Sequence, residues 1–326
     1  MLELTLVEAV ALALARAMAD DENVVVLGED VGANGGVFRA TVGLQERFGA
    51  QRVLDTPLAE ALIGGLCVGM AAQGLKPVAE IQFMGFMYPC IDQLVNHASR
   101  LRNRTRGRLS CPMVLRMPMG AGIRAPEHHS ESTEAMLAHI PGLRVVIPSS
   151  PARAYGLLLA AIRDPDPVVF LEPTRLYRSI KEQVTDDGEA LPLDTAFRLR
   201  DGRDVTIVTW GAAVRETLSA ADTLVESGIG ADVIDLGTLK PYDETLVLAS
   251  VKKTGRCVIV HEAARTGGFG AEIAACIAER GLMSLLAPIE RVTGYDTVVP
   301  LPKLEQHYMP STERIVAAVR RVCAFA

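Results

Sequence analysis

Short apolar segments alternate with longer apolar or amphipathic segments over the first 180 residues. Apolar runs of about four to eight residues are typical of buried strands, and longer periodic segments are typical of helices. Strands that alternate with helices form a parallel sheet covered on both faces. The pattern therefore predicts an α/β domain over residues 1–180. Its strands are expected at 24–27, 52–55, 78–83, 113–116, 144–147 and 168–171, and its helices at 5–19, around Glu60, at 89–101 and at 151–163.

The alternation breaks over residues 181–204, which are rich in Asp, Glu, Gly and Pro and have only scattered apolar positions. Such a segment is typical of a linker between domains. The prediction is an α/β protein with two doubly wound domains, 1–180 and 205–326, joined by the linker 181–204. In the second domain, strands are expected at 205–210, 232–236 and 256–260, and helices are expected to end near Ser227, to span 243–252 and 269–280, and to start at Ser311.

The chain has 326 residues, of which 49% are hydrophobic, so it is long enough for two domains with a large core. Its net charge of −6 provides no general attraction to nucleic acid or anionic lipid. Arginines occupy every second position from Arg100 to Arg108, but no aromatic residue lies between them for stacking on bases. We interpret these arginines as solvated or as paired with a partner subunit, and we expect no nucleic acid binding.

The six cysteines form no Cys-x-x-Cys pair and no zinc-ligand spacing, which indicates mostly buried, reduced thiols in a cytosol-like compartment. The first residues lack the basic head and apolar run of a signal peptide. The uncharged run 61–75 is shorter than the roughly 18–20 residues that span a bilayer. We therefore expect a cytoplasmic protein with no membrane role.

Glu60 is an unusual carboxylate for its position. Thr56 and Pro57 are expected to cap and begin a helix, and a capping-box carboxylate would then stand at Ala59. Glu60 lies one residue later, at the start of the uncharged run, where an ionised group is costly without a partner. The alternative is a carboxylate that is stabilised only by the N-terminal dipole of the helix.

The glycines do not support a nucleotide site of a familiar kind. No Gly-x-Gly-x-x-Gly follows a strand, and no phosphate-binding loop of the P-loop type is present. Residues 267–270 could hold an anion at a helix start, although a tight turn is the preferred interpretation. Gly65 and Gly69 lie on one helix face, where missing side chains allow close approach of another helix, often at a subunit contact.

His128 and His129 suggest a metal site only superficially. They lack the spacing His-Glu-x-x-His, and adjacent side chains on an extended segment point in opposite directions. We therefore do not expect zinc at this pair.

The spacing of Glu60, Gly65 and Gly69 resembles the glutamate–glycine signature of the pyrimidine-binding domain of thiamine diphosphate enzymes, with Met70 where that signature commonly has glutamine. More widely, the chain resembles the beta subunit of the decarboxylating component of 2-oxo acid dehydrogenase complexes. The resemblance implies a pyrimidine-binding domain followed by a transketolase C-terminal-like domain. The similar segments are Gly28-Glu-Asp-Val-Gly32, Gly35-Gly-Val-Phe-Arg39, Asp55-Thr-Pro-Leu-Ala-Glu60, Pro77-Val-Ala-Glu-Ile-Gln-Phe83, Pro141-Gly-Leu-Arg-Val-Val-Ile-Pro148, Ala161-Ile-Arg-Asp-Pro-Asp-Pro167, Phe170-Leu-Glu-Pro173 and Gly255-Arg-Cys-Val-Ile-Val-His-Glu262.

The resemblance implies roles for five residues. Glu60 matches the glutamate that hydrogen-bonds the pyrimidine ring of thiamine diphosphate, with Phe86 and Leu58 as its apolar neighbours. Glu29 matches an acidic residue behind the pyrimidine, and His129 matches a substrate-facing histidine that serves catalysis together with Glu60. From the residues alone, Phe86 could equally be a core residue and Glu29 a carboxylate in a strand-end turn.

The resemblance also implies ions and partners. A structural potassium ion is expected at backbone oxygens around Met113, Ala161, Asp164 and Asp166. The chain contains no Gly-Asp-Gly motif, which in thiamine enzymes holds magnesium and the diphosphate. The resemblance therefore implies an alpha subunit that holds the magnesium, in an α2β2 assembly, and a lipoyl acyltransferase that docks near residues 322–325.

The expected reaction is decarboxylation of a 2-oxo acid and transfer of the acyl group to a lipoyl arm, and the chain is expected to be active only with its alpha subunit. Pyruvate is the first choice of substrate, because Ala125-Pro-Glu-His-His129 is similar to bacterial pyruvate-type subunits. Branched-chain 2-oxo acids are the second choice, because Ala287-Pro-Ile-Glu-Arg-Val-Thr-Gly294 is similar to the branched-chain type. Acetoin is a third. The alternative from another class is a non-catalytic α/β binding subunit.

Overall fold

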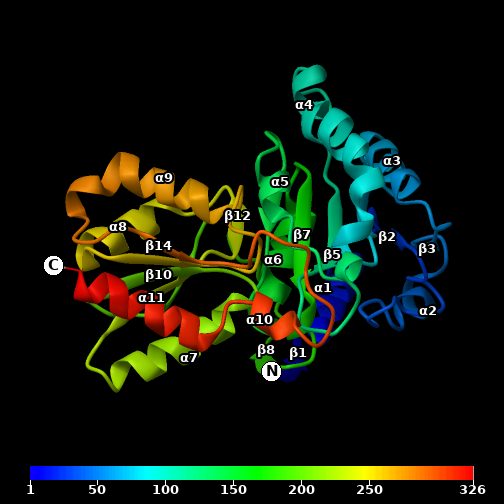
Figure 1. The fold of residues 1–326 in the computed structure, drawn as a ribbon. Helices are drawn as coiled ribbons and strands as arrows, with labels where there is room; N and C mark the ends of the chain where they lie inside the picture. The colour runs from blue at the N-terminus through cyan, green and yellow to red at the C-terminus, as the bar shows by residue number, and fades with distance from the viewer. Residues whose placement is uncertain (326) are drawn as a thin grey trace. The chain divides into compact units, whose positions relative to one another are not determined.

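The computed structural model describes residues 1–325 and divides the chain into two compact units (Figure 1). Unit 1 contains Met1–Met119 and Met136–Leu193, and unit 2 contains Gly120–Ala135 and the described residues from Asp194 onward. The segment Gly120–Ala135, which precedes much of unit 1 in the sequence, is therefore part of unit 2. No helix in the described part of the chain has the length and apolar character needed to cross a membrane.

A parallel sheet forms the centre of unit 1. Its strands lie in the order β6-β7-β5-β4-β2-β3, and every neighbouring pair is parallel, as the sequence predicted. Nearly all their side chains are buried, which explains why these strands are almost continuously apolar. The strands are β2 (Val24–Gly28), β3 (Val53–Asp55), β4 (Lys76–Glu80), β5 (Val114–Met119), β6 (Arg144–Val146) and β7 (Val168–Pro173).

Helices α1 (Leu6–Asp20) and α6 (Pro151–Arg163) pack against each other in unit 1. Helix α1 begins with a capping box, in which the Thr5 N–H donates to Glu8 Oε2 at 2.8 Å. Ser150 caps α6, and its Oγ accepts from the Arg153 N–H. A separate antiparallel pair joins β1 (Leu2–Thr5) to β8 (Lys181–Val184), which lies in the segment predicted as a linker.

The helix predicted at 89–101 is present but irregular. The chain is helical over this range, in a succession of 3₁₀, π and α turns that ends at Arg104. The Ser99 hydroxyl donates to the Val95 carbonyl at 2.9 Å, a local bond that competes with the regular helical pattern. These turns are η1 (Met84–Phe86), η2 (Tyr88–Cys90), the π-helical η3 (Gln93–His97), η4 (Ala98–Arg100) and α4 (Leu101–Arg104).

The predicted start of the Glu60 helix is also wrong. Helix α3 spans Glu60–Ala72, and its N-cap is Ala59 rather than Thr56. The Thr56 N–H donates to the carbonyl of Gly28 at 2.9 Å, and the Asp55 carboxylate accepts from the Gly32 N–H at 2.6 Å. These bonds hold residues after β3 in an extended path, so the helix begins at Glu60 itself.

Unit 2 contains a second sheet with the strand order β14-β13-β10-β11-β9. All pairs are parallel except β11 with β9, and β9 (Phe197–Arg200) also lies in the predicted linker. The other strands are β10 (Val205–Thr209), β11 (Ala231–Asp235), β13 (Cys257–Val260) and β14 (Glu290–Val292), and β12 (Thr238–Lys240) is a short strand in this part of the chain.

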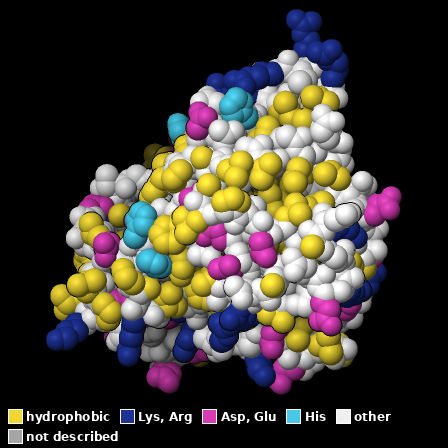
Figure 2. All heavy atoms as spheres, turned by 90° about the vertical axis from the view of Figure 1, so that its right-hand side faces the viewer, with side chains coloured by type: hydrophobic (Ala, Val, Ile, Leu, Met, Phe, Trp, Pro, Cys, Tyr) yellow, Lys and Arg dark blue, Asp and Glu magenta, His cyan; other side chains and the backbone are white. Residues whose placement is uncertain are grey.

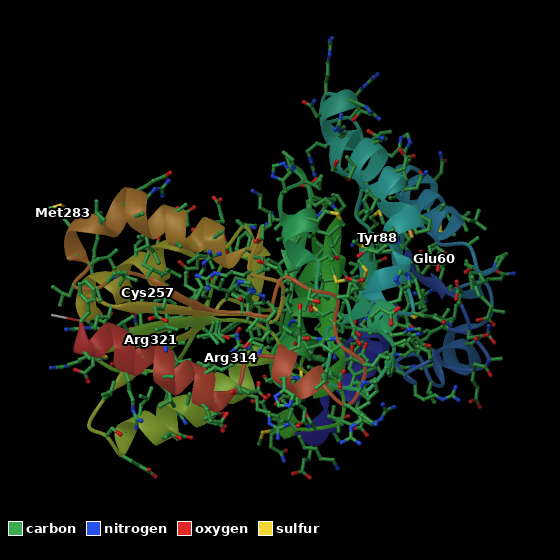
Figure 3. All side chains as sticks on the ribbon, in the orientation of Figure 1. Glu60, Tyr88, Cys257, Met283, Arg314 and Arg321 are labelled. Atoms are coloured by element: carbon green, nitrogen blue, oxygen red, sulfur yellow. The ribbon has the colours of Figure 1, made fainter. Side chains whose placement is uncertain are left out.

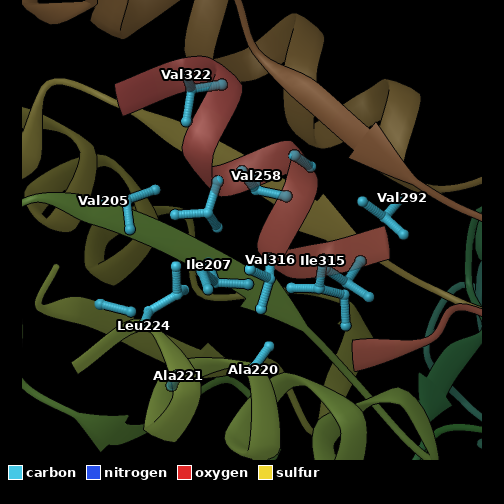
Figure 4. Packing of buried hydrophobic residues seen from close by; sticks show 14 of the residues in the cluster. Val205, Ile207, Ala220, Ala221, Leu224, Val258, Val292, Ile315, Val316 and Val322 are labelled. Atoms are coloured by element: carbon cyan, nitrogen blue, oxygen red, sulfur yellow. The ribbon is translucent and has the colours of Figure 1, made fainter. Parts of the chain in front are cut away.

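Helices cover both faces of this second sheet (Figure 1). Alanines and Leu224 from α7 (Ala213–Val225) and mainly valines from α11 (Thr312–Ala324) form a buried cluster with β10 and β13 (Figure 4). The other helices of unit 2 are α8 (Glu244–Thr254), α9 (Gly270–Gly281) and the short α10 (Glu305–Tyr308). Two α/β units with mostly parallel sheets confirm the predicted fold class.

Candidate functional site

The carboxyl ends of β2, β3 and β4 gather the polar residues of the candidate site in unit 1. Parallel strands end at the same edge of a sheet, and ligands of open α/β sheets bind at that edge. Glu29 directly follows β2, Glu60 follows β3 after four intervening residues, and Phe86 lies in η1 beyond β4. Three residues that the sequence predicted for the site therefore follow three neighbouring strands.

Glu60 is the first residue of α3 and is half-buried (Figure 3). Its negative charge acts on two neighbours. It raises the pKa of Glu29, and after burial it is the second cause that raises the pKa of the Cys90 thiol to about 12. No described residue of the chain hydrogen-bonds or pairs with the Glu60 carboxylate. Its place at a helix N-terminus is compatible with the dipole interpretation, while the absence of a partner within the described chain leaves its acceptor oxygens available.

Glu29 is a buried carboxyl group, with 8% of its surface exposed. Burial raises its pKa, and the charges of Glu60 and Asp30 raise it further. Among the described residues, Glu29 Oε1 has no hydrogen-bond partner, and neither does the buried hydroxyl of Thr56. Buried polar atoms are nearly always hydrogen-bonded, so these two call for a partner. A strand-end turn alone does not explain Glu29.

The apolar candidates differ in their surroundings. Phe86 is half-buried, and its ring meets that of Phe83 edge to face, with centroids 5.7 Å apart. Phe83 in turn contacts Phe38 at 5.3 Å, so Phe86 lies at the border of an aromatic cluster. Leu58 does not belong to the core, because 79% of its surface is exposed. An apolar side chain this exposed, next to Glu60, is available to a ligand or a partner chain.

This set of groups fits the aminopyrimidine that the resemblance implies. An aminopyrimidine combines N–H donors with an apolar ring face, and the unit offers the orphaned Glu29 oxygen, the Glu60 carboxylate and the half-buried Phe86 ring. For the metal that binds a diphosphate, the described residues contain no group of three or more His, Cys, Asp or Glu side chains suited to hold one.

His129 lies in unit 2, in the one-turn 3₁₀ helix η5 (Glu127–His129). The expectation of an extended segment is wrong here, because the His129 N–H donates to the Pro126 carbonyl at 2.9 Å and closes a turn. The two histidines nevertheless differ in exposure: His128 is exposed and His129 is half-buried. His129 is therefore the more constrained of the two.

The residues predicted for potassium lie together around the ends of α6 and β5. Met113 and Ala161 are buried. Both aspartates are already paired, Asp164 with Arg144 at 2.8 Å and Asp166 with Arg102 at 2.7 Å. A cation here would therefore depend on backbone carbonyl oxygens, each of which has a second lone pair.

The glycines at 267–270 form a turn that packs against a histidine. Gly267 has a positive φ of 68°. A Cβ on Gly268 or Gly270 would lie 2.7 Å from an atom of the His261 imidazole, so these positions admit no larger side chain without movement. His261 is fully buried and stacks on Trp210 with ring centroids 5.0 Å apart. The preferred interpretation of this segment as a tight turn is confirmed.

Sequence reasoning missed a buried charge cluster in unit 1. Arg116, 1% exposed, donates to Glu80 Oε2 at 3.0 Å and to both oxygens of Glu172 at 2.7 and 2.9 Å. The Tyr177 hydroxyl also donates to Glu172, at 2.5 Å. Burial would lower the pKa of Arg116, but the two carboxylates raise it. The available signal was a charged residue near the end of each of three adjacent strands: Glu80 is level with Arg116, and Glu172 lies two residues further along its strand.

Comparison with known proteins finds relatives along nearly the whole chain. Residues 3–180 match the family "Transketolase, pyrimidine binding domain", and residues 194–315 match "Transketolase, C-terminal domain". The chain is 50% identical over 319 residues to the "Pyruvate dehydrogenase E1 component subunit beta" of Acholeplasma laidlawii, with 98% of each chain covered. It is 46% identical over 325 residues to the protein of the same name from Bacillus subtilis (strain 168), with 100% of each covered.

Among solved structures, the chain is similar to one described as "Split gene transketolase, inactive beta4 tetramer". The TM-score is 0.82 over 99% of each chain, and 22% of the residues are identical. At this level of identity the likeness concerns the fold.

Proposed function

The chain belongs to the transketolase-like family of thiamine diphosphate enzymes and, within it, to the beta subunits of the pyruvate dehydrogenase E1 component. On this basis we propose that it acts with an alpha subunit to decarboxylate pyruvate and to transfer the acetyl group to a lipoyl arm. The observation that carries the proposal is the pair of carboxyl groups at the strand ends of unit 1, where a buried Glu29 oxygen lies near the charge of Glu60 without a donor from the described chain.

Thiamine diphosphate, when bound, would supply the nucleophilic carbon and the electron sink for decarboxylation. The proposed task of Glu60 is to share a proton with the pyrimidine ring, which a half-buried carboxylate at a helix start is suited to do. Glu29 would accept a hydrogen bond from the same ring system, and its raised pKa permits it to hold a proton more readily than an exposed glutamate. Phe86 and Leu58 would provide apolar contacts.

The alpha subunit is proposed to cover the outer face of α3. This face is exposed, carries no charge and forms an open groove. Figure 2, which views the side on which Figure 1 draws α3, shows hydrophobic side chains gathered across it. Gly69 has no atom within 4 Å of the place of a Cβ, so a partner helix could approach closely. The groove is lined by Ala61, Leu62, Gly65, Leu66, Gly69, Met70, Gln73 and Leu75.

The remaining parts of the proposal concern the magnesium, potassium and acyltransferase sites. We infer that the alpha subunit holds the magnesium with the diphosphate. Potassium is proposed at the backbone carbonyl oxygens of Met113, Ala161, Asp164 and Asp166, because the carboxylates of both aspartates are already paired with arginines. The acyltransferase is proposed to dock near the C-terminal end of α11, where Phe325 is 52% exposed.

Coexpression with the native alpha subunit tests this proposal. We expect the α2β2 enzyme to decarboxylate pyruvate with a higher kcat/KM than 2-oxoisovalerate or acetoin, and we expect the isolated chain to bind thiamine diphosphate weakly. Full activity in a homogeneous preparation without an alpha subunit would refute the proposed division of the site. A preference for 2-oxoisovalerate would instead select the branched-chain substrate, to which residues 287–294 are similar.

A further inference from the structure

Residues Gly120–Glu131 form a closed loop within unit 2, and the loop carries His129. Its two ends are joined because the Gly120 N–H donates to the carbonyl of Glu131 at 2.8 Å. Within the loop, Gly120, Gly122 and Arg124 have φ values of 88°, 102° and 60°. Left-handed backbone at alternate positions turns the N–H groups of Ala121, Gly122 and Arg124 away from the usual partners along the chain. These groups therefore depend on acceptors from elsewhere in the fold.

Two buried glutamates accept these N–H groups. Glu305 Oε1 accepts from Gly122 at 2.8 Å, and Glu305 Oε2 accepts from Arg124 at 3.2 Å. Glu262 Oε1 accepts from the Ala121 N–H. A Cβ on Gly120 would lie 2.7 Å from Glu262 Oε1, so this carboxylate also fills the space that a side chain at residue 120 would need. Hydrogen bonds to ionised acceptors are stronger than neutral ones, so three such bonds hold the start of the loop firmly.

The backbone around Glu305 is itself fixed in unit 2. Glu305 begins α10, and Arg314 of α11, labelled in Figure 3, donates to the carbonyls of Tyr308 and Met309 at 3.3 and 3.0 Å. Ala121 of the loop packs against Tyr308 and Met309 in a small buried cluster. The loop thus meets α10 through both polar and apolar contacts, and Glu305 is 2% exposed.

We propose that Glu262 and Glu305 are positioning residues that hold the loop 120–131 by its backbone and thereby fix His129. They act through the amides of Ala121, Gly122 and Arg124 and do not contact the substrate. This inference rests on a proposed role of His129, because a histidine side chain is suited to moving protons when a lipoyl disulfide is opened. It adds two residues to which the sequence analysis assigned no role, although Glu262 lies in one of the segments that are similar to the family.

The test uses the assembled enzyme with its alpha subunit and the variants Glu305→Ala, Glu305→Gln and His129→Ala. In Glu305→Ala we expect amide hydrogen exchange in the peptide covering 120–131 to accelerate by about 10- to 100-fold, which corresponds to the loss of a charged hydrogen bond. Trypsin should then cut after Arg124 faster than in the wild type. Glu305→Gln retains an acceptor oxygen at the same reach and should restore most of the protection.

Function is measured in two assays on the same variants. Glu305→Ala should lower acyl transfer to a lipoyl domain more than decarboxylation with an artificial electron acceptor, as His129→Ala should. The double variant Glu305→Ala/His129→Ala should transfer acyl groups as fast as His129→Ala alone, because both changes remove the same function, that of His129. Gly120→Ala provides a second way to release the loop, since its methyl group would displace the Glu262 side chain without altering either carboxylate chemically.

Glu290→Ala is the matched control. Glu290 is another glutamate of unit 2 with two hydrogen bonds, from Arg321 at 2.7 and 2.5 Å, and it should leave loop exchange and both assays unchanged. Unaltered exchange in Glu305→Ala would overturn the inference. So would a released loop with normal acyl transfer, if His129→Ala does impair transfer. A released loop combined with an inert His129→Ala would support the anchoring by Glu305 and refute the proposed role of His129.

Discussion

Unit 1 contains two groups of carboxylates that differ in how their charges are satisfied. Glu80 and Glu172 lie in the interior around Arg116, where Glu172 accepts three hydrogen bonds from Arg116 and Tyr177. Glu29 and Glu60 lie at the strand ends, where Glu29 Oε1 has no partner among the described residues and where burial, and then the charge of Glu60, raises the pKa of Glu29.

The difference indicates which group serves structure and which serves chemistry. A buried charge with complete partners contributes to a unique fold, and its removal leaves its partners uncompensated. A carboxyl group that is left without a partner within the described chain weakens the fold slightly and is available to a ligand. Stability and activity should therefore respond in opposite ways to mutation of the two groups.

The largest expected effect on stability follows Arg116→Met. This change leaves Glu80 and Glu172 buried without a counter-charge, and we expect the free energy of unfolding to fall by about 3–5 kcal/mol. Urea denaturation of the variant measures the loss. Arg102→Met is the control, since it breaks the exposed pair with Asp166 and should cost about 0–1 kcal/mol. Similar losses in the two variants would remove the distinction between the interior cluster and a surface pair.

Glu60→Gln should have the converse phenotype. The amide cannot share a proton as a carboxylic acid does, so we expect decarboxylation by the assembled enzyme to slow by about 10²- to 10⁴-fold. Hydrogen–deuterium exchange at the reactive carbon of thiamine diphosphate measures the step directly. If Glu60 serves only the helix dipole, the variant should instead lose about 0.3–1 kcal/mol of stability and retain its exchange rate. These two outcomes separate the interpretations that the sequence left open.

His261 extends the comparison to a buried group in unit 2 that stays neutral. Burial lowers its pKa to about 3, whereas an unfolded histidine has a pKa of about 6.5. Because the unfolded chain takes up the proton first, the free energy of unfolding should fall as the pH drops below about 6.5, by about 2 kcal/mol between pH 7 and pH 5. His261→Phe should lose this part of the pH dependence, whatever its constant packing cost. A slope equal to that of the wild type would contradict the assignment.

The smallest expected effect is that of Glu29→Gln on stability. The pKa of Glu29 is raised in the folded state, so the folded protein binds the proton more tightly than the unfolded chain. The free energy of unfolding attributable to this group is therefore lost as the pH rises above the ordinary value of a glutamate. Melting temperatures at pH 4 and pH 8 should show that the variant gains stability at pH 8 only. A loss at pH 8 would place Glu29 with the paired carboxylates of the interior.

The strands and long helices could be predicted because each carries its own signal. The apolar runs of β2, β5, β7, β10 and β13 lie close to the predicted ranges, and α6 spans the predicted residues 151–163. The capping box of Thr5 and Glu8 is a local bond, which a sequence of eight residues already contains. The prediction for the start of α3 failed because Thr56 and Asp55, which precede the helix, are held by bonds to Gly28 and Gly32. These glycines lie much earlier in the sequence.

The candidate site was predicted unevenly for the same reason. Glu60 was noticeable because it begins an uncharged run, and Glu29 and Phe86 entered through a resemblance to a family. Glu262 and Glu305 carry no local signal of their contact with the loop, because Gly122 and Glu305 are separated by 183 residues. Arg116, Glu80 and Glu172 belong to different strands, and only the register of β4, β5 and β7 brings their side chains together.

The sequence by itself determined the α/β class and the family, because hydrophobic periodicity and the Glu60–Gly65–Gly69 spacing are properties of nearby residues. Only the tertiary structure decided which carboxylates have partners: Glu172 accepts from Arg116, while Glu29 has no donor for Oε1 within residues 1–325. The physical reason is that the cost of a buried charge depends on what lies within about 3 Å of it. In a folded chain those neighbours come from strands and loops that the order of residues does not place side by side.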